Sequence, residues 1–174
     1  NDTSYDALNE VARVTVDRID VTEARGPIYA RARCEALMTD ADYFLQIDCH
    51  SRFFPDWDEI LLQEFAKASE LNDNAVLSHY PINIKNMASS DHLDRIGHVN
   101  RYRYIEADAI KSHGSLIKLP EVPATSLSIS AAMLFMRAKD RRRFPYDPEL
   151  DFGLHAAEQV LYAVRLWTHG FDIF

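Results

Sequence analysis

Short apolar segments alternate with amphipathic ones along this chain, and this alternation constrains the fold more than any other feature. Residues 43–47 form a nearly continuous apolar run of strand length, typical of a strand buried on both faces. The segments 28–38 and 55–69 have helical apolar spacing, and a second short strand is predicted at 75–79. Strands and helices in this order predict an α/β fold with a mixed, mostly parallel sheet flanked by helices.

The remaining segments are predicted from the same two periodicities and from turn residues. Gly170 follows the last amphipathic segment and is well placed to end a helix there. The other predicted elements are strands at 11–19, 99–107, 116–119 and 127–135, a turn at His113-Gly114, a loop at 83–98 and a last helix at 156–169.

The charge balance excludes several classes of function. The net charge is −8, whereas a general binder of nucleic acid or of anionic membranes needs a large basic field. The one basic cluster, at 139–143, is predicted to be a solvated loop, with contact to a phosphate or an acidic acceptor as the alternative. No apolar run approaches the roughly 20 residues that span a bilayer. A length of 174 residues predicts one domain.

The two cysteines bear on the compartment of the protein. Cys34 and Cys49 belong to no C-x-x-C pair, so neither a zinc ribbon nor a thioredoxin-like site is supported. We expect two free thiols in or near the core, with a single disulfide as the alternative. Free thiols fit a reducing compartment, and the predicted location is therefore cytoplasmic.

Asp48 and His50 directly follow the predicted strand at 43–47. Ligands of sheets with parallel strands bind at the carboxyl ends of those strands, which is where these two side chains are expected. Together they supply one oxygen and one nitrogen ligand, a set that suits Mn²⁺ or a similar ion and leaves positions open for phosphate oxygens. The alternative is a strand-end aspartate that makes a local turn, beside a surface histidine.

The surroundings of this turn resemble the nucleotide-sugar-binding half of GT-A glycosyltransferases, in which a D-x-D or D-x-H turn holds a metal. The resemblance covers residues 25–58 and rests on Gly-Pro-Ile-Tyr-Ala-Arg at 26–31, Tyr-Phe-Leu-Gln-Ile-Asp-Cys-His at 43–50 and Trp-Asp at 57–58. The most similar family is that of GlcNAc transferases that modify hydroxyproline in a cytoplasmic protein. The polypeptide GalNAc transferases are similar as well.

A second block, at 144–174, resembles the part of the same family that faces the sugar and the acceptor. Its motifs are Phe-Pro-Tyr-Asp-Pro at 144–148 and Arg-Leu-Trp-Thr-His-Gly-Phe-Asp at 165–172. Where the family has Gly-Glu-Glu or Gly-Glu-Asn, this chain has Ala157-Glu158-Gln159. It therefore departs from the pattern at the glycine and at the third position, while Glu158 keeps the first acid.

The resemblance implies a mechanism and a set of site residues. It implies that Asp48 and His50 bind Mn²⁺ or Mg²⁺ at the diphosphate of a UDP-sugar donor. Arg31 and, more weakly, Arg25 would contact the diphosphate, and Glu158 would be the catalytic residue, in contact with the transferred sugar or the acceptor hydroxyl. The family transfers with retention of anomeric configuration. The acceptor hydroxyl would belong to a protein or a glycan, or to a lipid-linked sugar.

The donor that the resemblance implies is UDP-GlcNAc, with another UDP-sugar as the alternative. In similar enzymes a third metal ligand, often a histidine, lies downstream of the Glu158 helix, and this chain ends at Phe174 before any such residue. The internal candidates for that ligand are His79, His92, His98 and His113.

Two other functions fit parts of the same pattern. A non-catalytic sugar-binding or scaffold domain derived from a transferase is favoured by Ala157 and Gln159. A metal-dependent hydrolase with a dinuclear centre would need clustered His and acidic residues, and the sequence contains no H-x-H or H-x-x-E-H spacing. Because little chain precedes the predicted helix at 28–38, we also expect the GT-A domain at 1–174 to be partial at both ends.

Overall fold

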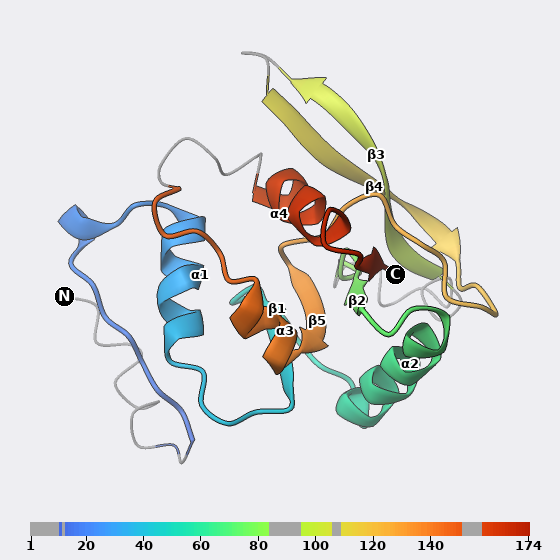
Figure 1. Ribbon diagram of the computed structural model, residues 1–174, viewed down its shortest axis with the longest axis horizontal. Coiled ribbons are helices and arrows are strands. Elements are labelled where there is room, and N and C mark those ends of the chain that lie inside the picture. The colour runs from blue at the N-terminus through green and yellow to red at the C-terminus, as the bar shows by residue number, and fades with distance from the viewer. Residues whose placement is uncertain (1–10, 12, 84–94, 106–108, 151–157) are drawn as a thin grey trace. The chain divides into compact units, whose positions relative to one another are not determined.

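Figure 1 shows the computed structural model, which describes residues 11, 13–83, 95–105, 109–150 and 158–174. The chain divides into two compact units, and each is considered by itself. The first unit comprises residues 1–41 and 145–155, and the second comprises 42–144 and 156–174. The prediction of one partial domain over 1–174 stays a prediction. Among the described residues, no helix combines the length and apolarity that crossing a bilayer requires.

The second unit is built on a four-stranded mixed sheet with helices against it. β5 runs antiparallel to both β1 and β2, and β2 runs parallel to β6, so three of the strands share one direction. This confirms the predicted α/β class with a mixed sheet. In the order of the sheet, the strands are β1 (Tyr43–Ile47), β5 (Met133–Arg137), β2 (Ala75–Ser78) and β6 (Asp172–Ile173).

The core of the second unit lies between the sheet and α2 (Trp57–Leu71). Phe65 packs edge-on against Phe135 of β5, with ring centroids 5.4 Å apart, and both rings contact Tyr43. The predicted apolar stripe of this helix is only partly buried, because Ile60 and Leu62 are exposed. Likewise β1 is not buried on both faces as predicted, since Tyr43 and Ile47 at its two ends are exposed.

The basic run at 139–143 forms a short helix, α3 (Ala138–Arg143), where a solvated loop was expected. The helix ends at Arg143, and Phe144 precedes a proline, a position that disfavours helical backbone. Arg141 is fully buried, and its guanidinium lies 5.1 Å from the ring centroid of Phe44 and 4.2 Å from that of Tyr162. The prediction was wrong because one arginine of the run points into aromatic side chains rather than into solvent.

β3 (Arg95–Ile105) and β4 (Ala109–Lys118) form a separate two-stranded antiparallel ribbon, seen in Figure 1. The predicted turn at His113-Gly114 is wrong, because both residues lie inside β4, where Gly114 pairs with Val99. The sequence predicts Gly114 as a turn residue, but it lies in a strand, where the missing Cβ leaves space for the side chain of Tyr80. The predicted loop at 83–98 falls largely on residues outside the described ranges.

The first unit contains the 3₁₀ turn η2 (Val21–Glu23) and the helix α1 (Pro27–Ala36), which confirms the helix predicted at 28–38. Gly26 caps α1 with a φ of 93°, a conformation that favours glycine, and Pro27 occupies the first helical turn. Glu35 is buried, and its carboxylate accepts a hydrogen bond of 3.0 Å from the backbone amide of Tyr146.

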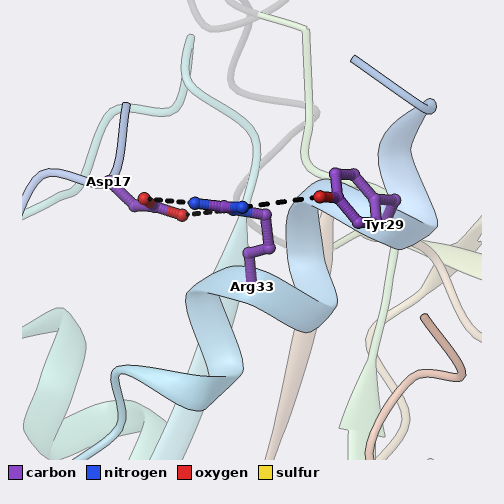
Figure 2. Close-up of polar contacts among 3 residues, drawn as sticks. All are labelled: Asp17, Tyr29 and Arg33. Carbon is purple, nitrogen blue, oxygen red and sulfur yellow. Dashed lines mark hydrogen bonds and ion pairs between the residues drawn. The ribbon is translucent and has the colours of Figure 1, made fainter. Parts of the chain in front are cut away.

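The strand predicted at 11–19 is wrong, because the described residues of this segment form no strand. Val11 and Val14 remain 50% and 38% exposed, so their alternation does not bury a face. Asp17 instead accepts two hydrogen bonds from Arg33, of 2.6 and 2.8 Å, and Arg33 also donates to the Tyr29 hydroxyl (Figure 2). A β-pattern needs a neighbouring strand to pair with, and a short stretch of sequence does not show whether there is one.

Candidate functional site

The turn that follows β1 carries the two predicted metal ligands. The Asp48 side chain is 34% exposed and that of His50 is 83% exposed. A hydrogen bond of 3.2 Å from the Ser51 amide to the Asp48 carbonyl closes the turn. As a result, the His50 Nε2 lies 3.9 Å from the Asp48 Oδ2, and solvent reaches both side chains. The structure thus brings together the two residues that the sequence singled out.

The distance between these two atoms is compatible with binding one cation. Two ligand atoms on neighbouring positions of an octahedral ion, each bonded at about 2.1 Å, lie about 3 Å apart. The 3.9 Å between the Asp48 carboxylate oxygen and the His50 nitrogen exceeds that separation by about 1 Å, so side-chain rotation would be needed for both to bind one ion. No group of three His, Cys, Asp or Glu side chains suited to a metal occurs in the part of the chain that the structure describes. Asp48 and His50 therefore fit a divalent cation as two of its ligands.

The histidines considered as a third ligand do not cluster with this pair where the structure describes them. His98 is engaged with the carbonyl oxygen of Thr125 at 3.0 Å, and His92 lies outside the described residues. His79 directly follows β2, and desolvation lowers the pKa of its imidazole below the usual value. His113 lies within β4. None of the described ones joins Asp48 and His50 in a group of ligands.

The direction of the strands places several segments at one edge of the sheet. Because β1 and β2 both run antiparallel to β5, their carboxyl ends lie at the edge where β5 begins. Asp48 follows β1 there, and His79 follows β2. Strand ends of this kind are where α/β sheets bind ligands, and ligand binding at this edge stays a prediction.

A loop that leads into β5 is hydrogen-bonded to both neighbouring strands at this edge. We call residues 126–132 the serine loop, since Ser126, Ser128 and Ser130 alternate along it. The Ser78 hydroxyl accepts a hydrogen bond of 2.7 Å from the Ser130 amide and donates one of 2.7 Å to the Met133 carbonyl. The Gln46 side-chain amide donates to the Ala131 carbonyl at 2.8 Å. These bonds connect the serine loop to β1, two residues before Asp48, and to β2.

The same loop also contacts the first turn of α4 (Glu158–Trp167). The Ser128 hydroxyl donates to the backbone carbonyl of Gln159 at 3.4 Å. Glu158, the predicted catalytic residue, is only 2% exposed. Asp48, His50 and Glu158 therefore all belong to the second unit, where the serine loop links the segments that carry them.

The two predicted phosphate-binding arginines belong to the first unit. Arg31 lies on α1 and is half-buried, and Arg25 precedes that helix with its guanidinium 5.2 Å from the ring centroid of Tyr29. Their contact with a diphosphate stays a prediction.

The cysteines differ from the expectation. Cys34 and Cys49 are free thiols, as predicted, but both are exposed rather than in or near the core. Cys49 occupies the solvent-facing turn between the two candidate ligands, and its Sγ lies 3.9 Å from the His50 Nδ1. The general tendency of cysteine to be buried does not apply where the backbone turns outward.

Sequence reasoning missed the polar residues that hold this edge of the sheet. Gln46 and Ser78 lie within predicted strands and were treated as ordinary strand residues. The available signal was the alternation of Ser126, Ser128 and Ser130 within an apolar segment, which was interpreted as part of a buried strand at 127–135. β5 begins later, at Met133, because the serines bond to neighbouring segments instead of continuing the ladder.

Comparison with known proteins identifies the family. Residues 3–174 match the sequence model of a family described as Glycosyltransferase (GlcNAc). No curated protein and no solved structure matches the chain. The family implies a sugar donor and an acceptor as substrates. Since the match covers nearly the whole chain, the protein belongs to the GlcNAc glycosyltransferase family.

Proposed function

We propose that this protein is a metal-dependent glycosyltransferase that moves GlcNAc from UDP-GlcNAc to a hydroxyl acceptor with retention of anomeric configuration. The observation that carries the proposal is the pair formed by Asp48 and His50 at the carboxyl end of β1, with 3.9 Å between an oxygen and a nitrogen that both accept a cation. Both side chains are accessible to solvent, which leaves room for the diphosphate of a donor. Membership of the GlcNAc glycosyltransferase family supports the type of reaction.

In this proposal Asp48 and His50 would hold Mn²⁺ or Mg²⁺. A divalent cation supplies charge neutralisation for the departing UDP without proton transfer. Arg25 and Arg31 bind the diphosphate oxygens, for which guanidinium groups offer paired donors. These roles follow from the resemblance of residues 25–58 to the donor-binding half of the family.

Glu158 faces the transferred sugar or the acceptor hydroxyl in this proposal. Its burial at the first turn of α4 is suited to holding a carboxylate in one orientation, which a positioning contact with a sugar hydroxyl requires. With retention, the acceptor attacks on the side of the leaving diphosphate, and an oxygen of that diphosphate takes the proton. We therefore assign no separate general base. The acceptor is a hydroxyl of a protein, a glycan or a lipid-linked sugar.

The test is binding and turnover of UDP-sugars by the wild type and by Asp48→Ala. With Mn²⁺ present, titration calorimetry is expected to show that the wild type binds UDP-GlcNAc. The affinity of Asp48→Ala should be at least about 100-fold lower, because this variant lacks a direct ligand of the metal. Glu59→Ala, which removes an exposed carboxylate of α2, is the matched control and should bind like the wild type. Equal affinity of Asp48→Ala and wild type would contradict the metal assignment.

A scaffold function is the second candidate, and the position of Gln159 favours it. This residue replaces the second acid of the family pattern, and its side chain is hydrogen-bonded within the protein. UDP release from a panel of UDP-sugars with Mn²⁺ separates the two functions. Release from UDP-GlcNAc supports the transferase, whereas neither release nor binding of any UDP-sugar supports the scaffold. Phosphoester cleavage without a sugar nucleotide would support a hydrolase.

The proposed compartment is the cytoplasm. Cys34 and Cys49 are both free and exposed, which fits a reducing environment.

A further inference from the structure

The side chain of Gln159 connects the start of α4 to two other segments of the second unit. Its Oε1 accepts a hydrogen bond of 3.0 Å from the Tyr80 hydroxyl and another from the Ser112 hydroxyl. The two hydroxyls lie 3.4 Å apart. The second residue of α4 is therefore tied both to β4 and to the segment that follows β2.

Tyr80 is held firmly against the β3–β4 ribbon. Its backbone amide donates to the Gly97 carbonyl at 2.8 Å. A Cβ on Gly97 would overlap the Tyr80 carbonyl oxygen, and a Cβ on Gly114 would lie 2.7 Å from the Tyr80 Cδ2. Both glycines thus make room for Tyr80, so its backbone and ring have little freedom to move.

The strand geometry brings the two hydroxyl donors together. Ser112 and Gly114 are two residues apart in β4 and hence lie on the same face of the ribbon. The Tyr80 ring contacts Gly114, and its hydroxyl reaches Ser112, which is buried. Gln159 therefore meets two donors whose positions are set by contacts within the ribbon and not by α4.

We propose that Gln159 is a positioning residue, which acts through Tyr80 and Ser112 to hold the first turn of α4 and with it the carboxylate of Glu158. This inference rests on the proposed function, in which Glu158 faces the sugar or the acceptor. Glu158 and Gln159 are consecutive residues of one helical turn, so a rotation of that turn displaces both side chains. Gln159 itself does not contact the substrate.

The test compares four variants of the full chain. Gln159→Leu removes the acceptor oxygen, Gln159→Glu keeps an oxygen that accepts from both hydroxyls, and Tyr80→Phe removes one donor. Gln63→Leu, on the exposed side of α2, is the matched control. The first measurement is kcat and KM for UDP release from UDP-GlcNAc with Mn²⁺. The second is hydrogen exchange of the Tyr162 and Ala163 amides, which bond to the carbonyls of Glu158 and Gln159 in an α-helix.

We expect kcat to fall about 10- to 100-fold in Gln159→Leu, since small misplacements of a reacting group cost that much. KM for UDP-GlcNAc should stay within about twofold, because Asp48 and His50 are unchanged. Exchange of the two amides should become at least about tenfold faster. Gln159→Glu should have a kcat and an amide exchange rate close to those of the wild type. Tyr80→Phe should lie between Gln159→Leu and the wild type in both, and Gln63→Leu should match the wild type.

Three results would overturn the inference. One is a kcat of Gln159→Leu equal to that of the wild type, even with faster amide exchange. Another is an equal loss of kcat in Gln159→Glu and Gln159→Leu with normal exchange, which would indicate a direct role in the chemistry. The third result applies if Gln159→Leu does not fold: Tyr80→Phe would then have the same kcat and the same amide exchange as the wild type. Absence of UDP release from the wild type would instead refute the proposed function, and amide exchange would still decide whether Gln159 holds the helix.

Discussion

The two places in the second unit that carry the candidate chemistry differ in how they are held. Asp48 and His50 lie on an open turn, and the His50 side chain is 83% exposed. Glu158 is 2% exposed, and its neighbour Gln159 is hydrogen-bonded to β4 and to Tyr80. The turn with Asp48 and His50 exposes its polar side chains to solvent, whereas the start of α4 buries its polar side chains inside the fold.

This difference predicts separate consequences for stability and for binding. A polar side chain in water gives little to the folded state, because it is solvated almost as well in the unfolded chain. A buried polar group is costly when its surroundings change, because lost contacts are not replaced by water. Substitutions on the turn should therefore affect ligand binding alone, whereas substitutions around α4 should also lower the free energy of unfolding.

The largest effect is expected for Arg141→Ala. Arg141 lies between the rings of Phe44 and Tyr162, and its removal leaves a cavity against the start of β1 and against α4. We expect the free energy of unfolding to fall by about 3 kcal/mol, measured by urea denaturation. Arg142→Ala, an exposed neighbour on the same helix, should change it by less than about 0.5 kcal/mol. Equal losses in both variants would remove the distinction between buried and exposed positions.

The second effect concerns binding at the turn. His50→Ala removes one candidate ligand and should weaken Mn²⁺-dependent binding of UDP-GlcNAc about 10- to 100-fold in calorimetry. Its urea midpoint should equal that of the wild type, because the side chain is mostly in solvent. A loss of stability above about 1 kcal/mol would place the turn with the buried region and contradict the comparison.

The smallest effect is expected for the exposed ion pair of the first unit. Arg33 lowers the pKa of the Asp17 carboxyl below 3.8, so a proton binds more weakly in the folded chain than in the unfolded one. The stabilisation is complete above that ordinary pKa and is lost as the pH falls through the lowered pKa. The melting temperature of the wild type should exceed that of Asp17→Asn slightly at about pH 6, and the difference should shrink as the pH falls below the ordinary pKa of the carboxyl.

Added salt is the control for this last prediction. Because both groups are exposed, about 1 M NaCl should shrink the difference at about pH 6 by screening the pair. A difference between the two proteins that did not change with pH would show that Asp17 acts by packing instead of by charge.

Local sequence patterns predicted the elements whose apolar residues recur with the period of a strand or a helix. The strand at 43–47 and the helices at 28–38 and 55–69 were placed within about two residues, because burial against a sheet requires the spacing seen in their sequences. The turn with Asp48 and His50 was also found, since it directly follows the first of these elements. The strand predicted at 11–19 failed, because pairing depends on a partner elsewhere in the chain.

The sequence by itself determined the family and the position of the Asp48–His50 turn, since both depend on short runs of neighbouring residues. Only the tertiary structure decided which polar groups lie inside the fold. Arg141 packs against Phe44 and Tyr162, and Gln159 contacts Tyr80 and Ser112, so each of these contacts joins residues at least 21 positions apart. Such contacts depend on how strands and helices pack, because burial and the pairing of polar groups are properties of the whole fold.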